Sequence, residues 1–380
     1  MMVKKFRYLK IPIEQDLKNK MVFVGGPRQV GKTTLALSLL DPSNEKNPAY
    51  LNWDILNHQK MILRVEIPLS SSLIILDEIH KYARWRNFIK GLYDEHHSTN
   101  RFLVTGSARL DYFNKGGDSL LGRYHYYRLH PFSLCELNSN PTQSDTEHLL
   151  AWGGFPEPLF SGESKTLKRW QNERNHRIIH EDLISLQYVK ELSLLDLLMD
   201  ALPERVGSPL SIKNLAEDLS VSPATVQRWI TLFDNLYVSF RIPPYGAPRI
   251  RAVKKEQKLY LWDWTQISDP GARFENMVAL HLLKYCHFQT DTLGEKYELR
   301  YLRDTDKREI DFVVLKNKKP IMAIECKVSD KSLSPHISYF RERTEIPKFY
   351  QVHMGGNDFG HENTGRVLPF WDFCIKEGMI

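Results

Sequence analysis

The sequence predicts an α/β fold built on a parallel sheet and followed by two smaller domains of different texture, and three observations support this prediction. Residues 21–24 form a short apolar run that leads into a glycine-containing loop and then into a helical pattern, which is the order strand, loop, helix. Residues 73–76 form a second apolar run that ends in two acidic residues. Towards the C-terminus, a helical pattern precedes two apolar runs around a short turn, which is typical of a helix followed by a β-hairpin.

Size and composition limit the kind of protein that this chain can be. Its 380 residues exceed what one hydrophobic core usually organises, so we expect two or three domains. Hydrophobic residues at 42% and charged residues at 26% are close to the average of globular proteins, which argues against long disordered segments. A formal net charge of +6 is compatible with a polyanionic partner but does not establish one.

Neither a membrane segment nor a secretory signal is expected. No apolar run approaches the roughly 20 residues that span a bilayer, and residues 1–10 lack the apolar core of a signal peptide. The four cysteines are far apart and form no metal-type pair, so we expect thiols instead of disulfides or a zinc site. We therefore expect a cytoplasmic protein without a membrane partner.

The loop after the first apolar run has the pattern of a phosphate-binding loop. Glycines allow its backbone N–H groups to turn towards phosphate oxygens, and the following helix adds partial positive charge at its N-terminus. Lys32 would reach the β- and γ-phosphates, and the Thr33 hydroxyl would bind a magnesium ion. A glycine-rich turn without a ligand is the alternative. The expected cofactors are ATP and Mg²⁺, and the expected nucleotide-binding residues are Gly26, Pro27, Arg28, Gln29, Val30, Gly31, Lys32, Thr33 and Thr34.

The acidic pair after residues 73–76 has two expected roles. A buried parallel strand delivers such residues to the carboxyl edge of the sheet, where the phosphate loop also lies. Asp77 would hold the magnesium ion, largely through its water shell, and Glu78 would polarise the water that attacks the γ-phosphate. A strand that simply ends in solvated acids is the alternative.

Two further strands are expected at residues 50–53 and 101–105, which gives a sheet of at least four strands. The second of these runs leads to Ser107. The hydroxyl of Ser107, or that of Thr105, would hydrogen-bond the attacking water or the γ-phosphate. A hydroxyl that caps the next helix is an equally good interpretation.

The middle of the chain has the pattern of a helix-turn-helix followed by a wing. Residues 211–219 and 222–230 form two helical patterns around a short connection, and Ser222 with Pro223 marks the start of the second helix. Residues 237–242 and 258–262 are expected strands around a basic loop. A protein-protein adaptor is the alternative to DNA binding, and few outward side chains can read a base edge. The expected DNA contacts are Thr225, Gln227, Arg228, Arg249, Arg251, Lys254, Lys255 and Lys258.

The C-terminal hairpin is expected to bring two carboxylates together. We expect a helix at residues 274–285 and strands at 298–302, 310–315 and 321–327. A symmetric register pairs Leu315 with Ile321 and places Asp311 opposite Glu325, with Lys327 on the same face. Carboxylates about 5 Å apart repel each other unless a proton or a cation lies between them. A magnesium ion is the natural partner for such a pair.

Several motifs follow one another along the chain: Gly26 to Thr34, Leu76 to His80 with Trp85, Thr105-Gly106-Ser107, Gly122-Arg123, Leu129 to Ser133 and Gly153 to Pro156. Taken together, they resemble those of prokaryotic AAA-type ATPases that carry a C-terminal domain known as DUF4143. The resemblance implies an AAA+ fold with three layers, and an arginine that approaches the γ-phosphate, often from a neighbouring subunit. Arg123 is the candidate for this arginine, and its alternative role is a surface ion pair. If it acts on a neighbouring subunit, the protein is a homo-oligomer, for instance a ring.

A second resemblance concerns the C-terminal hairpin. Asp311 with Glu325-Cys326-Lys327 is similar to the PD-(D/E)XK nuclease pattern, and Glu275 lies on the preceding helix where that fold often has another acid. The resemblance implies that Asp311 and Glu325 bind magnesium, that Lys327 orients the water or neutralises developing charge, and that Glu275 supports the metal. An inactive relic of the fold, or simple pairing of Lys327 with one of the acids, is the alternative.

These expectations combine into one domain plan and one function. An AAA+ ATPase domain at residues 1–203, with its core at about 15–135 and a helical lid at about 136–203, precedes a winged helix-turn-helix at 204–265 and a nuclease-like domain at 266–380. We expect a protein that hydrolyses ATP, binds DNA through its shape or backbone, and processes it, for instance as branched or junction DNA, with the magnesium-dependent C-terminal domain. The alternative is a nucleotide-dependent interaction or regulatory switch whose nuclease-like domain is inactive.

Overall fold

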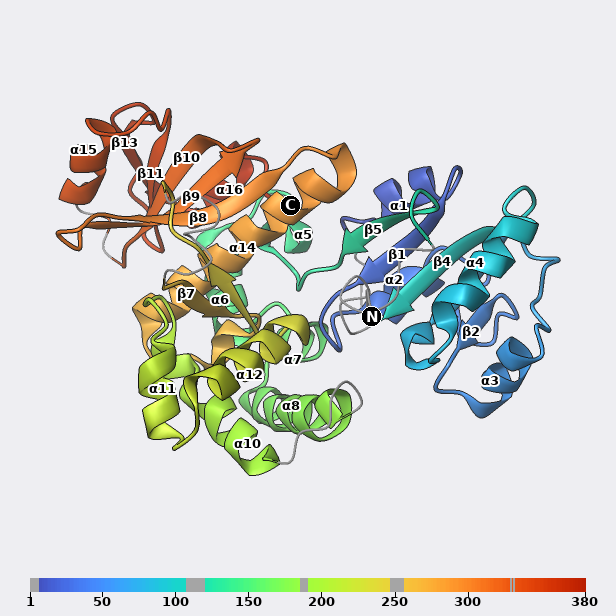
Figure 1. Cartoon of the computed structure of the whole chain (residues 1–380). Helices are drawn as coiled ribbons and strands as arrows, with labels where there is room; N and C mark the ends of the chain where they lie inside the picture. The colour runs from blue at the N-terminus through green and yellow to red at the C-terminus, as the bar shows by residue number, and fades with distance from the viewer. Residues whose placement is uncertain (1–6, 107–119, 185–190, 247–255, 329, 331) are drawn as a thin grey trace. The chain divides into compact units, whose positions relative to one another are not determined.

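The computed structural model describes residues 7–106, 120–184, 191–246, 256–328, 330 and 332–380 (Figure 1). The chain forms two compact units, Met1–His130 and Pro131–Ile380. The predicted α/β architecture is confirmed, with a parallel sheet in the first unit and a separate sheet near the C-terminus. The finer division into ATPase, winged-helix and nuclease-like domains stays a prediction.

The first unit is built on a five-stranded parallel sheet with the strand order β2-β3-β4-β1-β5. The four strands expected from the sequence are present, and β5 adds a fifth. In chain order the elements are α1 (Lys10–Asp16), β1 (Met21–Gly25), α2 (Lys32–Leu37), β2 (Tyr50–Asn52), α3 (Leu56–Leu63), β3 (Leu73–Asp77), the 3₁₀-helix η1 (Ile79–Lys81), α4 (Trp85–His96), β4 (Arg101–Gly106) and β5 (Tyr124–Arg128).

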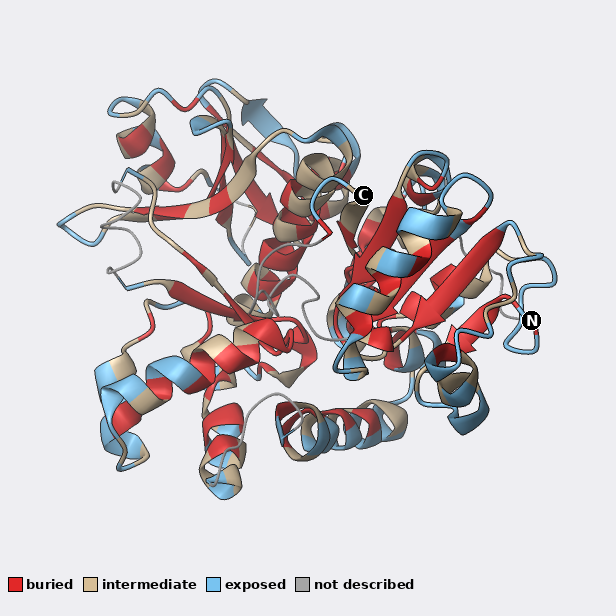
Figure 2. Cartoon of the chain, turned by 45° about the vertical axis from the view of Figure 1, so that its right-hand side comes forward, coloured by how far each residue is buried: buried red, intermediate tan, exposed pale blue. Residues whose placement is uncertain are grey.

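Helices cover both faces of this sheet, which explains why its strands are apolar on both sides. Phe23, Ile74 and Phe102 point to one face and form a core with residues of α3 and α4. The residues between them in the strands point to the other face, where α1 packs against β1 and α2 packs against β3 and β4. Figure 2 shows the buried strands in red between these helices. The result is a three-layer sandwich in which all strands end at one edge.

The second unit begins with helices. Residues 136–203, expected to form a helical lid, are mostly helical where they are described, and residues 185–190 lie outside the described part of the chain. The elements are α5 (Leu134–Leu137), α6 (Gln143–Trp152), α7 (Pro156–Ser161), α8 (Ser164–Arg177), the π-helix η2 (Ile178–Leu183), α10 (Leu192–Ala201) and the 3₁₀-helix η3 (Pro203–Arg205).

A helix-turn-helix pair follows, as the sequence predicts. Its helices are α11 (Ile212–Asp218) and α12 (Pro223–Asn235), and Ser222 caps α12 by accepting the Thr225 N–H at 3.1 Å. The apolar face of α12 is fully buried. The strands β6 (Ser239–Ile242) and β7 (Lys258–Leu261) then form an antiparallel pair. The connection between them includes residues 247–255, which lie outside the described residues, so the tip of the predicted wing is not characterised.

The C-terminal part holds a six-stranded sheet and the 24-residue helix α14 (Pro270–Leu293). Asp269 caps this helix by accepting the Ala272 N–H at 2.7 Å. Among the described residues, no helix combines the length and the apolar character needed to span a membrane. The remaining elements are the 3₁₀-helix η4 (Trp264–Gln266), β8 (Tyr297–Arg303), β9 (Glu309–Lys316), β10 (Lys319–Cys326), α15 (Pro335–Arg341), β11 (Phe349–His353), β12 (Phe359–His361), β13 (Gly365–Pro369) and α16 (Phe370–Lys376).

The turn of the β9–β10 hairpin differs from the prediction. Leu315 pairs with Pro320 and not with Ile321, because the turn is only two residues long, Asn317 and Lys318, both with positive φ as a type I′ turn requires. The register then shifts by one residue between Pro320 and Met322, which leaves Ile321 as a bulge. Beyond the bulge the predicted register returns. Phe312 pairs with Ile324, so that the next residues, Asp311 and Glu325, still face each other.

A buried ion pair fastens the start of the second unit to α14. The Lys284 side chain is 1% exposed, and its ammonium contacts the Glu136 carboxylate and donates hydrogen bonds to Ser133 Oγ at 2.8 Å and to the Pro131 carbonyl at 3.3 Å. One turn earlier, His281 Nε2 accepts the Leu134 N–H at 3.1 Å. Burial lowers the pKa of His281 to about 4, so that the ring is neutral and can accept this bond.

Replacing Lys284 with methionine tests how much this anchor contributes. Lys284→Met leaves the Glu136 carboxylate buried without its cation, so we expect the free energy of unfolding of the second unit to fall by about 3–5 kcal/mol. Urea unfolding followed by circular dichroism measures this change. The same substitution at Lys213, whose side chain is 80% exposed, is the control and should leave the midpoint nearly unchanged. Equal midpoints for the two variants would show that the ion pair does not anchor the segment.

Candidate functional site

The predicted phosphate loop lies between β1 and α2 and has the backbone of an anion-binding turn. Gly26, Gln29 and Gly31 have φ values of 153°, 62° and 96°, and Gly31 is the N-cap of α2. A Cβ atom on Gly26 would lie 2.4 Å from the Leu129 carbonyl oxygen, so that no other residue fits there without a shift of backbone. The glycine at position 26 thus allows the loop to lie close to the end of β5.

Arg7 also supports the loop from outside. Its side chain is buried, and Nη1 donates to the Val30 carbonyl at 2.7 Å. Nη2 donates to the carbonyl of His130, the last residue of the first unit. Sequence reasoning missed Arg7, because its partners lie 23 and 123 residues away.

Two side chains of the predicted phosphate loop make contacts with neighbouring polar groups. Lys32 is 6% exposed, and its ammonium donates to the carbonyls of Gly26 at 3.0 Å and Pro27 at 2.7 Å, so that it lies inside the curve of the loop. Thr33 Oγ1 donates to Asp77 Oδ2 at 2.7 Å. A hydroxyl and a carboxylate at this distance are hard oxygen donors that fit a magnesium ion accompanying the phosphates.

The Asp77 carboxylate is the centre of a network at the carboxyl edge of the sheet. It is fully buried and also accepts hydrogen bonds from the hydroxyls of Tyr50, at 2.7 Å, and Thr105. Burial, and then the charge of Asp77, raise the pKa of Tyr50, so this hydroxyl stays a donor. Two hydroxyls were predicted near the γ-phosphate. That of Thr105 donates its hydrogen bond to Asp77, and Ser107 lies outside the described residues. Tyr50 was missed because the register of β2 against β3 cannot be read from local sequence.

Glu78 follows directly and has an unusual backbone. Its φ of 54° places a non-glycine residue in the left-handed region, which costs about 1–3 kcal/mol and is found mainly where a side chain must be aimed. The carboxylate lies 3.4 Å from the Lys81 ammonium, which also pairs with Asp54 at 2.6 Å, and 3.8 Å from His80 Nε2. Glu78 is thus turned out of the strand and held by a neighbouring cation.

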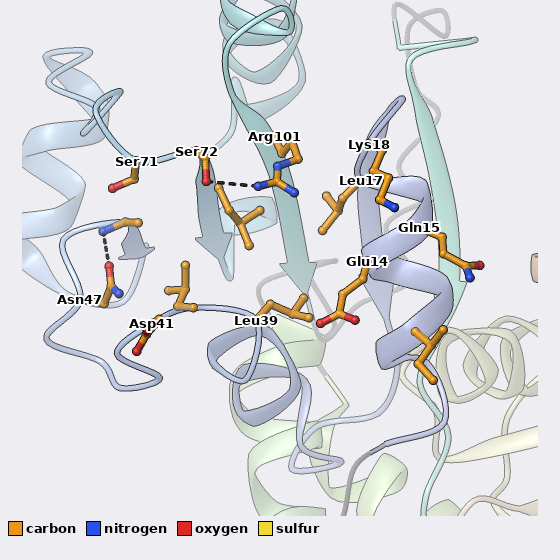
Figure 3. A pocket seen from close by; sticks show the side chains of 14 residues that line it. Glu14, Gln15, Leu17, Lys18, Leu39, Asp41, Asn47, Ser71, Ser72 and Arg101 are labelled. Atoms are coloured by element: carbon orange, nitrogen blue, oxygen red, sulfur yellow. Dashed lines mark hydrogen bonds between the residues drawn. The ribbon is translucent and has the colours of Figure 1, made fainter.

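A pocket of about 750 Å³ in the first unit lies at the opposite, amino edge of the sheet (Figure 3). It is lined by α1 and by the first residues of β3 and β4, where Arg101 donates to Ser72 Oγ at 3.1 Å. Its position excludes it as the site of the predicted triphosphate.

Arg123 also lies at the amino edge. It directly precedes β5, which runs parallel to β1, and pairs with Asp94 at 2.7 Å. The strand separates it from the phosphate loop by about five residues, or roughly 16 Å. The surface ion pair considered as its alternative role is therefore present, and only approach to a neighbouring subunit's phosphate stays a prediction.

The predicted DNA-binding residues differ in exposure. Gln227 and Arg228 are exposed on α12, and Thr225 is half-buried beside the Ser222 cap. The prediction that Lys258 contacts DNA is wrong. Its side chain is 1% exposed and ion-paired, because β7 turns it towards the C-terminal sheet and away from solvent. The remaining predicted contacts, Arg249, Arg251, Lys254 and Lys255, lie outside the described residues.

The acidic residues of the predicted nuclease centre gather around this lysine. Lys258 Nζ lies 3.3 Å from Glu275 Oε1, 2.5 Å from Glu309 Oε1 and 3.4 Å from Asp311 Oδ1. Tyr260, two residues further along β7, donates its hydroxyl to Glu275 at 2.7 Å. Burial, and next the nearby Asp311, raise the pKa of Glu275 to about 7.

The hairpin carboxylates have protein partners of their own. Asp311 Oδ2 accepts the Cys326 N–H at 2.8 Å, and Glu325 pairs with Lys327 at 2.7 Å. The second oxygen of Glu325 is buried without a hydrogen-bond partner, and burial followed by the charge of Asp311 raises the pKa of Glu325 to about 7. Three of the four carboxylate oxygens of Asp311 and Glu325 thus already face protein donors.

This arrangement does not fit the magnesium ion predicted for Asp311 and Glu325. Within the described residues, no group of three or more His, Cys, Asp or Glu side chains is arranged to hold a metal ion. A divalent ion needs oxygen lone pairs that converge on one point. Here an ammonium occupies that point, because the Glu275, Glu309 and Asp311 oxygens converge on Lys258 Nζ.

Comparison with protein families divides the chain into three regions. Residues 18–138 match a model described as an AAA domain, and residues 270–373 match the domain of unknown function DUF4143. Residues 143–265, between them, match a second domain of unknown function, DUF8612.

Two relatives and one solved structure give the range of similarity. The uncharacterized protein Rv2008c of Mycobacterium tuberculosis is 24% identical over 247 residues, which are 64% of this chain and 54% of the relative, so the match spans about half of that relative's length. The uncharacterized protein MJ1637 of Methanocaldococcus jannaschii is 23% identical over 96% of this chain and 86% of its own. The Orc1 protein of Aeropyrum pernix in complex with DNA covers 72% of this chain and 92% of its own at 12% identity, with a TM-score of 0.33.

The close approach at Gly26 gives a test of the loop geometry. Gly26→Ala should displace the loop from Leu129, so we expect saturable binding of a fluorescent ATP analogue to be lost or weakened at least tenfold. Fluorescence titration measures it. Gly91→Ala in α4 is the control, because nothing lies within 4 Å of the added Cβ and alanine favours a helix by about 0.5–1 kcal/mol. Unchanged affinity in Gly26→Ala would contradict the assignment of the loop.

Proposed function

Because the chain belongs to the AAA-type P-loop proteins that carry a C-terminal DUF4143 domain, we propose that it hydrolyses ATP in its first unit and binds DNA through its second. The observation that carries the ATPase part is the arrangement at the carboxyl edge of the sheet. Lys32 lies inside the phosphate loop, and the Thr33 hydroxyl meets the buried Asp77 carboxylate.

In this proposal each residue of the edge has one task. The loop N–H groups and Lys32 bind the β- and γ-phosphates, and they compensate the charge that develops as the γ-phosphoryl group is transferred. Thr33 and Asp77 hold Mg²⁺, which supplies further charge neutralisation when bound. Glu78 orients the attacking water and accepts its proton. The Lys81 ammonium lies 3.4 Å from the Glu78 carboxylate and holds it in place.

Assembly is part of the proposal. Arg123 lies at the amino edge of the sheet, beside Asp94, so it would approach the γ-phosphate only of a neighbouring chain. A homo-oligomer, for instance a ring, would bring this about.

DNA binding rests on the helix-turn-helix pair. Helix α12 buries one face and exposes Gln227 and Arg228 on the other, which is the layout of a helix that lies against nucleic acid. The net charge of +6 favours a polyanion, and the few exposed side chains favour contact with the backbone over base reading.

Replacing Glu78 tests the ATPase mechanism. Glu78→Gln keeps the size of the side chain but removes its ability to accept a proton, so we expect ATP turnover to fall at least a hundredfold while nucleotide affinity stays within about threefold. Phosphate release and fluorescence titration measure the two quantities. Lys32→Ala is the companion variant and should lose binding as well. Unchanged turnover in Glu78→Gln would exclude Glu78 as the base.

The role of α12 is tested by salt titration of DNA binding. Arg228→Ala should weaken binding to duplexes of any sequence and reduce the slope of log affinity against log salt by about one. Fluorescence anisotropy with two unrelated duplexes measures both. Arg64→Ala, an exposed arginine of the first unit, is the control and should leave the slope unchanged. Should both variants behave as the wild-type chain, α12 is not a DNA-binding helix.

A second function is favoured by the ion pairs of Lys258. If the C-terminal centre performs no chemistry, the second unit would serve as a nucleotide-dependent interaction or regulatory switch with a protein partner. The same salt titration separates the two functions, because a mainly apolar protein interface loses little affinity as salt rises, whereas phosphate contacts lose much.

A further inference from the structure

The lysine at the centre of the acidic cluster cannot move away as a surface side chain would. Lys258 is the first residue of β7, where it pairs with Ile242, and its backbone also bridges to Pro209. Its side chain is 1% exposed and lies over the ring of Tyr301, with Nζ 5.7 Å from the ring centroid. Both the backbone and the side chain of Lys258 are therefore held by neighbouring elements.

The charges around Lys258 explain why it stays protonated. Although burial opposes the charge, Glu275, Asp311 and Glu309 together raise the pKa of Lys258 above its ordinary value. Arg303 pairs with the second oxygen of Glu309 at 3.3 Å, so this acid is shared between two cations. A lysine with three carboxylates within 3.4 Å is the compensation that buried acids need.

We propose that Lys258 is the permanent cation of this centre, taking the position that a divalent metal would have among Glu275, Glu309 and Asp311, so that the C-terminal domain is not a metal-dependent nuclease. The three acids are contributed by α14 and β9, and the cation by β7. The centre thus joins the strand that follows the helix-turn-helix pair to the C-terminal sheet. This inference concerns the second unit alone and does not require that the first unit hydrolyse ATP.

The remaining donors agree with this assignment. The Cys326 N–H donates to Asp311 Oδ2, the oxygen that does not face Lys258, and Lys327 pairs with Oε1 of Glu325. A metal ion bound there would have to displace at least two of these bonds while being repelled by an ammonium.

The test is manganese binding to the nucleotide-free full-length chain, measured by the loss of the free Mn²⁺ signal in electron paramagnetic resonance. Wild type and Asp311→Asn should bind the same number of Mn²⁺ ions, because any ion near Asp77 is common to both. Lys258→Met removes the charge at similar length, and it should gain one Mn²⁺ site that the double variant Lys258→Met/Asp311→Asn lacks. Circular dichroism establishes that each variant is folded.

Three results would overturn the proposal. The first is a Mn²⁺ site in the wild-type chain that Asp311→Asn or Glu325→Gln removes. The second is Mg²⁺-dependent cleavage of linear or branched DNA that Glu325→Gln abolishes. The third is a folded Lys258→Met variant that binds no more Mn²⁺ than wild type. If Lys258→Met does not fold, the comparison of wild type with Asp311→Asn decides alone. A lack of ATP turnover would count against the proposed function and leave these measurements untouched.

Discussion

Charges that are kept from water determine the geometry of each centre in this chain. An ionised group that leaves water must regain its solvation from fixed dipoles or opposite charges, and only a few arrangements provide this. Asp77 is surrounded by hydroxyl donors, Glu136 by the Lys284 ammonium, and the acids of the C-terminal sheet by Lys258. Where hydroxyls supply the compensation, their oxygens can turn lone pairs towards an incoming cation. Where an ammonium supplies it, the place of that ion is already filled.

Local sequence was sufficient for the elements whose chemistry is contained in one short segment. The phosphate loop combines a strand, two glycines and Lys32-Thr33 within a dozen residues, and the helix-turn-helix pair has its caps and apolar face in sequence order. The strands of the first sheet followed from apolar runs. The order of these strands could not be predicted, because order and register depend on contacts between segments that are distant in sequence. The contacts of Tyr50 and Arg7 were missed because they too join distant segments.

Lys258 shows the limit of such reasoning most clearly. It ends a basic stretch, and by composition it belongs with the exposed charges of a wing. Its three acidic partners lie 17 to 53 residues further along the chain, and only the packing of β7 against α14 and β9 brings them together. The register of the hairpin was predicted only in part. A two-residue turn and a bulge at Ile321 changed the partner of Leu315, but Asp311 still faces Glu325.

The two hydrogen bonds of Arg7 have a consequence for communication along the chain. One guanidinium holds both the Val30 carbonyl in the loop and the carbonyl of His130, after which the polypeptide enters its other unit. A displacement of Val30 when the loop is filled or emptied must therefore either break one of these bonds or alter the torsion angles of the junction. The next residue, Pro131, has its own carbonyl bound by Lys284 of α14, so two consecutive carbonyls of the backbone, those of His130 and Pro131, each accept a hydrogen bond from a buried cationic side chain.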